Sequence, residues 1–442
     1  MKTGCRKHII ASLAAGLAAC SAVYAADGGS NNDYSPFSKY GIGTLNKVGT
    51  AYSRSMGGVG IAGRDNRYIN VLNPAAVTAR DSLSFMADFS VGEKSSFYKQ
   101  DTRTSIGNTF NITNFSMSFP IWRSSAFMVG ISPFSSVAYS VMDKTTDGYM
   151  GNTTQLYSGV GSLYQLYVGA GATFWKRLSI GAQFNYYFGN LEKYTSSTPA
   201  SSQYRSLYSG IKMPLQGFGG KFGLQYEQPI GKKDKLIVGA TYRLSTSVLG
   251  VDRQKGNSGY ILELATAVQS DIADTLINNS IPMDGVNIPQ EFAVGISYRH
   301  ADKWNMEVNY TRSDWTKSGM DGKKGFEVEK FSSTIAQSWN AGFEITPNRS
   351  DIRYYMKRCS YRVGGYYNVE YYKYKNMPIS SYGITLGMTM PVFRWLNGIT
   401  VGIDLGRRTP MGSDNMKIKE NYLGVNVSLN VFDIWFIKPQ YQ

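Results

Sequence analysis

The chain has 442 residues, of which 46 are Lys or Arg, 31 are Asp or Glu, 2 are His and 3 are Cys, and its formal net charge is +15. So few Cys and His residues exclude a metal centre built from them. They also exclude a hydrolase that depends on a catalytic His, because His300, the one His after the first 25 residues, lies in a short turn between two expected strands. We therefore expect neither an enzymatic activity nor a cofactor.

Residues 1–25 have the features of a secretory signal peptide. Three basic residues, Lys2, Arg6 and Lys7, precede an apolar stretch from Ile9 to Cys20. Two processing sites fit this segment: cleavage after Ala25, and lipidation of Cys20. We favour cleavage after Ala25, because a barrel gains little from one acyl chain. Cys359 is then the one Cys that remains, so no internal disulfide is expected.

Export of the chain changes both its net charge and the partners that its basic residues could bind. Loss of the three basic residues of the signal lowers the net charge from +15 to +12. Nucleic acid is the usual partner of a basic protein, and an exported chain does not meet it. We expect basic loops to face the phosphates of lipopolysaccharide, with simple solubility as the alternative explanation of the charge.

Residues 26–80 lack a clean alternation and are rich in Gly, Asn, Ser and Tyr. Gly58, Gly60 and Gly63 match the spacing of a dinucleotide-binding loop, but no strand–helix unit surrounds them, so nucleotide binding is not expected. Gly57, Gly58 and Gly60 instead favour a compact plug inside a barrel, because glycine lets the backbone pack closely against a wall.

From residue 81 to residue 442, fourteen short segments alternate apolar and polar residues. In the last segment, Leu423, Val425 and Val427 alternate with Gly424 and Asn426, and this period of two places the apolar row on one face of a β-strand. The links are alternately long and short, which the alternative, a soluble β-sandwich, does not require. The sequence therefore predicts an all-β fold, a 14-stranded antiparallel transmembrane β-barrel with the plug in its lumen and both termini in the periplasm.

Two features interrupt this pattern. Ser132-Pro133-Phe134 breaks the third segment, and proline removes a hydrogen-bond donor from a strand. The break is interpreted either as a lateral gate at Pro133 and Phe134 or as a strand end, with a long loop beginning near Ser135. The longest link, residues 250–290, has a helix-like spacing from Val268 to Leu276, which predicts a short helix at the barrel mouth.

The inward-facing positions of the segments are mostly small or charged. The charged positions expected in the lumen are Asp88, Lys221, Arg243, Arg299, Glu307, Glu344, Arg362, Glu370 and Asp404. We expect them to pair with each other or with groups of the plug, because an unpaired buried charge is costly. Inward-facing apolar side chains are few, so the wall itself lacks the lining of a tunnel for a hydrophobic ligand.

The N-terminal motifs resemble those of the FadL-type outer-membrane transporters of long-chain fatty acids, and of the related barrels of Bacteroidota. The resemblance is carried by Ser55 to Ala62 and by the turn Asn73-Pro74-Ala75, with further matches at residues 387–391, 406–408 and 435–438. It implies a 14-stranded barrel, a hatch formed by residues 26–80, and a kinked third strand through which a hydrophobic ligand leaves the lumen for the membrane.

Two functions follow from these observations. The first is passive uptake of a hydrophobic small molecule through rearrangement of the hatch and a lateral opening. The second is a non-conducting scaffold, as related barrels serve in type IX secretion and in the outer-membrane protein assembly machine. The retained hatch favours uptake, and the polar wall opposes it. The expected partners are outer-membrane lipid and lipopolysaccharide, with a hydrophobic ligand in the first case and partner proteins in the second.

Overall fold

The structure, a computed structural model, describes residues 35–80, 84–100, 103–122, 124–147, 151–201, 203–269, 272–392, 398–411 and 418–434. The chain divides into two units, Met1–Asn31 and Asn32–Gln442, and every described residue belongs to the second. The expected signal peptide, the start of the expected hatch (residues 26–34) and the aromatic pair Trp435 and Phe436 lie outside the described residues.

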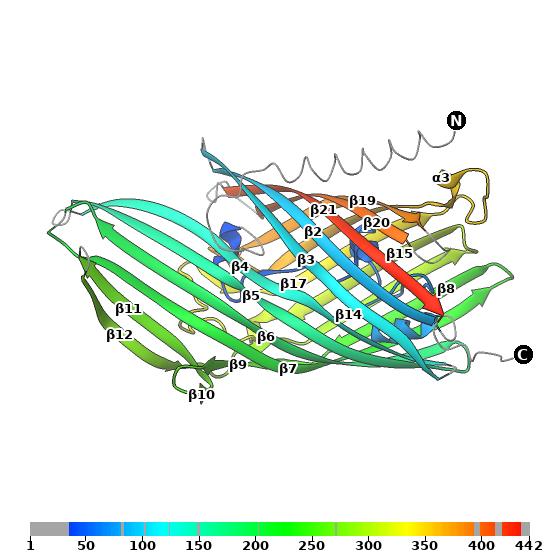
Figure 1. The fold of residues 1–442 in the computed structure, drawn as a ribbon, viewed down its shortest axis with the longest axis horizontal. Coiled ribbons are helices and arrows are strands. Elements are labelled where there is room, and N and C mark those ends of the chain that lie inside the picture. The colour runs from blue at the N-terminus through cyan, green and yellow to red at the C-terminus, as the bar shows by residue number, and fades with distance from the viewer. Residues whose placement is uncertain are drawn as a thin grey trace, which may run out of the picture. The chain divides into compact units, whose positions relative to one another are not determined.

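Fourteen long strands, each antiparallel to its neighbours, form a closed barrel (Figure 1). These strands are β2 (Ser84–Gln100), β3 (Arg103–Trp122), β4 (Ser125–Asp147), β5 (Gly151–Phe174), β6 (Leu178–Pro199), β7 (Ser206–Ile230), β8 (Asp234–Arg243), β14 (Glu291–His300), β15 (Trp304–Asp314), β17 (Ile335–Ile345), β18 (Ser360–Tyr374), β19 (Met377–Pro391), β20 (Gly398–Pro410) and β21 (Ile418–Ile434). The last strand closes the barrel by pairing with the first, from Ser84 opposite Ile434 to Gln100 opposite Ile418. The predicted 14-stranded antiparallel barrel is confirmed.

The two faces of the wall differ in the way that the alternation predicts. On β21, Leu423 and Leu429 are exposed, whereas Ser428 and Asn430 are buried on the inner face. The same alternation leaves large apolar side chains exposed along the outside of other strands, such as Phe218 and Ile384, which are 62% and 60% exposed. Water solvates such a surface poorly, so we assign this exterior to lipid.

Several strands are longer than the sequence predicted. A long loop was expected from about Ser135, but β4 continues to Asp147, and its neighbour β6 likewise extends to Pro199. The reason is pairing: β4, β5, β6 and β7 remain hydrogen-bonded to each other far beyond the expected strand ends. The interpretation of Pro133 as a strand end is therefore wrong.

The predicted helix at Val268–Leu276 is also wrong. This region forms a β-hairpin of β11 (Tyr260–Gln269) and β12 (Ile272–Pro282). β11 pairs with the far end of β7, where Leu262 lies opposite Lys212 and Val268 opposite Ser206. An available strand edge thus outweighs a helix-like spacing, because strand formation depends on cross-strand partners more than on local propensity.

The remaining elements are short. They are β1 (Thr44–Leu45), β9 (Thr246–Asp252), β10 (Asn257–Ser258), β13 (Asn287–Ile288), β16 (Phe331–Ser333), the α-helices α2 (Ala51–Arg54) and α3 (Tyr355–Arg358), and the 3-10 helices η1 (Pro36–Lys39), η2 (Pro74–Ala79) and η3 (Trp315–Lys317). None of the helices in the described part of the chain has the length and apolar character needed to cross a membrane.

Residues 35–80, which we call the plug, contact the inner face of the wall at several places. η1 contacts β4, α2 contacts β19, β20 and β21, and η2 contacts β4, β5, β6 and β7. β1 adds a short strand to β4, with Leu45 opposite Ser135. The plug therefore occupies the lumen between opposite sides of the barrel.

One large apolar cluster lies in the lumen beside the extended parts of β4, β5, β6 and β7. The plug contributes Phe37, Tyr40 and Ile42, and the segment that follows β15 contributes Trp315 and Phe326. Wall side chains complete the cluster, among them Phe134, Leu163, Tyr187, Leu191, Met213, Leu215, Tyr371 and Ile379. Most of these wall positions lie in strand extensions that the sequence pattern left as loops, so the lumen holds more apolar side chains than expected.

Candidate functional site

The glycines of the plug motif lie where its backbone meets the wall. Gly57 and Gly58 have φ angles of +77° and +84°, and a Cβ on Gly57 would lie 2.6 Å from the carbonyl oxygen of Ala341. The Gly57 N–H donates to Thr385 Oγ1 (2.7 Å), and its carbonyl accepts from Asn340 Nδ2 (2.6 Å). Gly60 serves packing within the plug, since a Cβ there would lie 2.7 Å from Leu72 Cδ1.

The Asn73-Pro74-Ala75 turn starts η2 and is held by its own Asn side chain. Asn73 Oδ1 accepts from the Ala75 N–H (3.0 Å), and Asn73 Nδ2 donates to the Ile61 carbonyl (2.7 Å). Pro74 takes the first position of the helix, where its missing N–H is not needed. The wall accommodates this turn through Gly223, because a Cβ there would lie 2.1 Å from Asn73 Oδ1.

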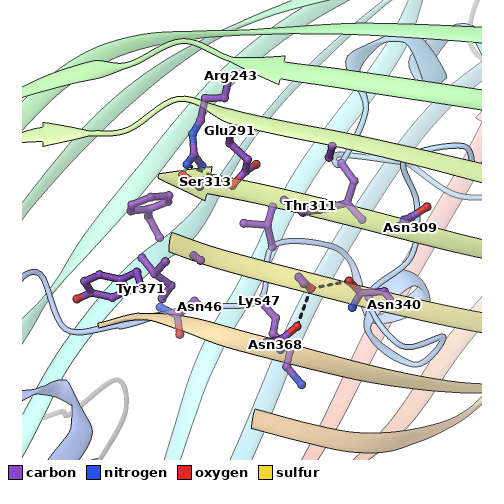
Figure 2. Close-up of a pocket in the computed structure, with 18 of the residues that line it drawn as sticks. Asn46, Lys47, Arg243, Glu291, Asn309, Thr311, Ser313, Asn340, Asn368 and Tyr371 are labelled. Atoms are coloured by element: carbon purple, nitrogen blue, oxygen red, sulfur yellow. Dashed lines mark hydrogen bonds and ion pairs between the residues drawn. The ribbon is translucent and has the colours of Figure 1, made fainter. Parts of the chain in front are cut away.

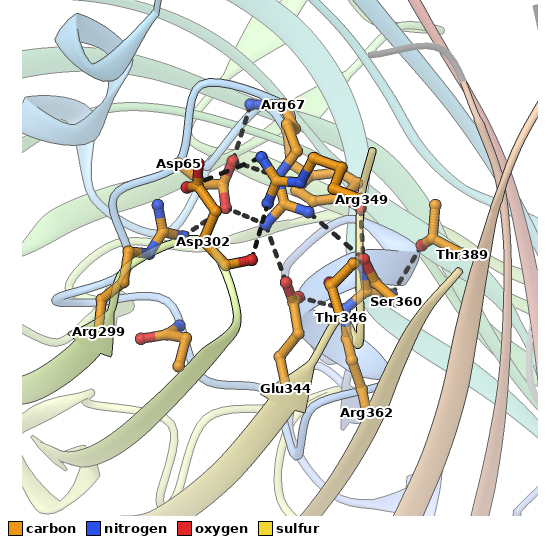
Figure 3. A network of polar contacts seen from close by, with 12 residues as sticks. Asp65, Arg67, Arg299, Asp302, Glu344, Thr346, Arg349, Ser360, Arg362 and Thr389 are labelled. Atoms are coloured by element: carbon orange, nitrogen blue, oxygen red, sulfur yellow. Dashed lines mark hydrogen bonds and ion pairs between the residues drawn. The ribbon is translucent and has the colours of Figure 1, made fainter. Parts of the chain in front are cut away.

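A buried ion-pair network joins the plug to three wall strands (Figure 3). Plug residue Arg67 contacts Asp65 at 2.5 Å and Glu344 of β17 at 2.9 Å. Arg362 of β18 donates to the same Glu344 (2.8 Å), and Arg299 of β14 pairs with Asp65. Burial alone would raise the pKa of Asp65, but Arg299 and Arg67 outweigh burial and hold this pKa well below its usual range.

Further ion pairs lie elsewhere along the lumen. Lys47 of the plug pairs with Asp404 at 2.6 Å. Arg408 pairs with Glu370 at 3.3 Å and with the fully buried Glu420 at 3.1 Å. On β8 and β14, Arg243 pairs with Glu291 at 3.2 Å.

Two of the expected lumen carboxylates are hydrogen-bonded rather than ion-paired. Glu307 accepts from the Ala62 N–H of the plug (3.0 Å), and Asp88 accepts from Ser90 Oγ (2.6 Å). The structure thus places all of the expected lumen charges against the lumen, and it adds partners that the sequence did not identify: Lys47, Asp65, Arg67, Arg408 and Glu420. Glu420 could have been found by continuing the inward-facing row of the last strand backwards from Ser428 in steps of two.

The wall is discontinuous beside Pro133 and Phe134. β3 and β4 pair from Trp122 opposite Ser125 up to Phe115 opposite Ile131 and no further. Beyond that point the tips of the β2–β3 hairpin and of β4–β7 lie apart (Figure 1). The exposed edge of β4 is partly covered by the plug, because β1 pairs with Ser135 and Ser136 and the Asn46 N–H donates to the Phe134 carbonyl (2.9 Å).

Pro133 and Phe134 lie at an irregularity within β4 rather than at its end. The register between β4 and β5 shifts between Pro133 and Ser135, which is the behaviour of a bulge. The Phe134 ring is buried in the lumen and packs edge-on against Tyr187, with ring centroids 5.0 Å apart. A cavity of about 130 Å³ adjoins the discontinuity and is lined by Thr44 to Lys47, Pro133 and Ser136 together with polar side chains of β2, β3 and β21.

A larger cavity of about 280 Å³ lies at the centre of the lumen (Figure 2). Asn46 and Lys47 of the plug border it, together with Arg243, Glu291, Asn309 and Asn340 of the wall. Its lining combines amide side chains with a larger number of apolar and aromatic ones. Within the described residues, no group of three or more His, Cys, Asp or Glu side chains is arranged to hold a metal ion.

Solved barrel structures share the fold of this chain. The chain is similar to a Pseudomonas aeruginosa FadL homologue, with a TM-score of 0.58, 10% identity, and coverage of 88% of this chain and 99% of that chain. It is similar to the toluene transporter TbuX of Ralstonia pickettii, with a TM-score of 0.55, 14% identity, and coverage of 87% and 98%. Identity at this level establishes a shared fold. No curated protein sequence matches the chain.

A family model gives a more specific assignment. The model of the family described as BamG matches residues 7–442, which is almost the entire chain. The match includes the plug, all fourteen strands and the links between them. This plugged 14-stranded barrel therefore belongs to the BamG family.

Proposed function

We propose that this protein is a non-conducting accessory barrel in an outer-membrane protein complex. The observation that carries this proposal is the buried network in which Asp65 and Arg67 of the plug pair with Arg299 and Glu344 of the wall. Breaking a buried ion pair by removing one partner costs about 3–5 kcal/mol. A plug that moved aside would break two such contacts, so we treat it as a fixed part of the barrel.

The family assignment supports the same role. The name BamG follows the naming of subunits of the outer-membrane protein assembly machine, and an accessory barrel of that machine is one of the functions considered from the sequence. The contents of the lumen also agree with this role. An apolar cluster lies at one end of the plug and a charged network at the other, so the path along the plug is not apolar over its whole length.

A scaffold needs a surface for its partner, and one turn is suited to this task. The link between Ile345 and Ser360 is the longest at its end of the barrel. It presents Ile352, which is 97% exposed, together with the exposed side chains of Tyr354 and Met356. The turn is ordered by Asp351, whose Oδ1 accepts from the N–H groups of Arg353 and Tyr354. Exposed aromatic and apolar side chains among Arg residues are typical of interface centres.

Conductance tests the non-conducting part of the proposal. The full chain is reconstituted into planar bilayers and compared with a variant that lacks residues 35–80. We expect no steady channel conductance from the full chain and open-channel steps from the variant, because the deletion removes the plug and its ion pairs. Steady conductance by the full chain would contradict a fixed plug.

Uptake of a hydrophobic small molecule is the second candidate, and the discontinuity between β3 and β4 favours it. Structures of this fold include proteins described as toluene transporters and as a monoaromatic hydrocarbon channel. In this proposal the plug rearranges, β1 leaves β4, and the ligand passes beside Pro133 and Phe134 into the membrane.

A disulfide lock separates the two candidates. Leu45→Cys combined with Ser135→Cys would join β1 to β4, because directly opposite residues of antiparallel strands are close enough for a disulfide. If the protein is a transporter, oxidation abolishes uptake of labelled oleate by cells, and reduction restores it. If it is a scaffold, oleate uptake does not depend on the protein in either state.

A further inference from the structure

The central cavity has the chemistry of a binding site that neither candidate function uses. Its volume is about 280 Å³, and the groups that line it converge from the plug and from wall strands on several sides (Figure 2). Amides are the most frequent polar groups in the lining, including Gln165, Gln183, Asn185, Asn309, Asn340 and Asn368. An amide offers both a donor and an acceptor, and so matches hydroxyl groups, which also do both.

Three of these amides have polar atoms without a protein partner. Gln183 Oε1, Asn185 Nδ2 and Asn309 Oδ1 accept or donate no hydrogen bond within the described structure. The three residues are 5%, 0% and 2% exposed, so bulk water does not compensate them. A buried polar atom left without a partner costs about 1–3 kcal/mol. The lining therefore offers two unpaired acceptors and one unpaired donor, which a ligand would match with two donors and one acceptor.

Most of the charged groups around the cavity are held in ion pairs. Arg243 pairs with Glu291 at 3.2 Å, and Glu291 also interacts electrostatically with Lys221. Lys47 pairs with Asp404, and Arg408 with Glu370 and Glu420. Apart from Lys221, whose ammonium shares Glu291 with Arg243, these groups could bind a charged ligand only by giving up a pair, which favours a ligand without charge.

The rest of the lining is apolar and partly aromatic. Ile61, Val71 and Leu72 of the plug line one part of the cavity, and Trp315 and Tyr371 line another. A sugar ring has hydroxyl groups around its edge and C–H groups on its faces, so it can meet amides and aromatic rings together. A hydrocarbon would leave the amides unpaired, and water alone would leave the apolar groups without contact.

We propose that the central cavity binds a small, neutral, hydroxyl-rich solute of monosaccharide size. The route to it passes the discontinuity between β3 and β4. Leu45, Asn46 and Lys47 line both the central cavity and the smaller cavity beside Pro133. Thr109, Thr113 and Asn426 contribute polar groups to the lining of the smaller cavity. This binding site is independent of whether the barrel is a scaffold or a transporter of hydrophobic molecules.

Fluorescence of Trp315 provides a direct test, because this residue lines the cavity and is 1% exposed. The full chain is prepared in an amine-oxide detergent, which has no sugar head group, and titrated with glucose, galactose, N-acetylglucosamine and myo-inositol. We expect a saturable change with at least one of these probes. The change should be absent in Trp315→Phe, while calorimetry still detects binding to that variant.

Matched variants distinguish the cavity from other sites. Asn309→Leu should weaken binding of the responding probe about tenfold, since it removes a hydrogen-bonding group without changing the charge. Asn348→Leu, in an exposed turn, should leave binding unchanged. A heat-dependent shift in gel mobility shows that each variant has folded. Absence of a saturable response to all four probes, or equal affinity in wild type and Asn309→Leu, would overturn the proposal.

Discussion

Arg67 of the plug and Glu344 of β17 lie 2.9 Å apart, although 277 residues separate them in the sequence. Both side chains are almost completely buried, and Arg362 of the neighbouring strand binds the second oxygen of the same carboxylate. One wall carboxylate therefore holds two guanidinium groups, one from the plug and one from the barrel. This arrangement links folding of the plug to folding of the wall.

Removal of Glu344 should destabilise the barrel strongly. Glu344→Gln leaves Arg67 and Arg362 buried without their common carboxylate, and we expect the free energy of unfolding to fall by about 3–5 kcal/mol. The midpoint of heat- or urea-induced loss of the folded gel band measures this change. Asp302→Asn is the control, because the Asp302 side chain is 73% exposed and exposed ion pairs contribute little. Equal effects of the two changes would show that the network is not important for stability.

Acid should weaken the attachment of the plug. The pKa of Asp65 is lower in the folded protein than in the unfolded chain, because Arg299 and Arg67 outweigh the effect of burial. The ionised carboxylate therefore stabilises the fold fully at pH values above the ordinary Asp pKa of about 3.9, and this stabilisation is lost as the pH falls below that value. We expect the unfolding midpoint to be flat near neutral pH and to drop below pH ~4. In Asp65→Asn the drop should be smaller, and an unchanged drop would assign the acid sensitivity to other groups.

Neighbouring glycines of β18 should differ in their tolerance of a methyl group. A Cβ on Gly364 would lie 2.3 Å from the backbone nitrogen of Gly57, whereas a Cβ on Gly365 has no contact closer than 3.7 Å. Gly364→Ala should displace the plug and destabilise the protein by about 1–3 kcal/mol, as overpacking does. Limited proteolysis of the plug and the unfolding midpoint report the effect. Gly365→Ala is the matched control and should behave as wild type, while a tolerated Gly364→Ala would contradict the close packing.

A charge on the outer face of the last strand should prevent correct insertion. Val427 lies in the outward row of β21, two residues from Leu429 and opposite Val91 of β2. Val427→Arg should cost about 2–4 kcal/mol if this position lies near the middle of the bilayer. The level of folded barrel in the membrane fraction tests this, with Val427→Leu as control. Normal levels of the Arg variant would show that Val427 does not face the hydrocarbon.

The wall could be predicted from the sequence because each strand repeats the same alternation of apolar and polar residues. Rows such as Leu423, Val425 and Val427 reveal both a strand and its lipid-facing side, and fourteen such rows identify the barrel. The contacts inside the lumen obey no such repeat. Arg67 contacts Glu344, and Asp65 contacts Arg299, because of the path that the plug takes through the lumen. Sequence spacing contains no information about that path.

Predictions from local sequence patterns were also wrong where pairing with another strand of the chain determines the structure. The spacing from Val268 to Leu276 resembles a helix, but β11 finds the edge of β7 and forms a strand. Pro133 was interpreted as a gate or as a strand end. In the structure β4 continues past it, while β3 stops pairing at Phe115. The apolar cluster around Trp315 and Phe326 was missed because its residues come from segments without a regular period.

The composition of the particle extracted from native outer membranes tests the central claim most directly. The tagged chain is purified in mild detergent and weighed by native mass spectrometry. An accessory barrel should be recovered with a partner protein in fixed stoichiometry. Ile352→Ser combined with Arg353→Glu should release that partner, because it changes the exposed turn, and Lys232→Ser in another turn at the same end of the barrel should not. Recovery of the wild-type chain as a single barrel under the same conditions would contradict the account.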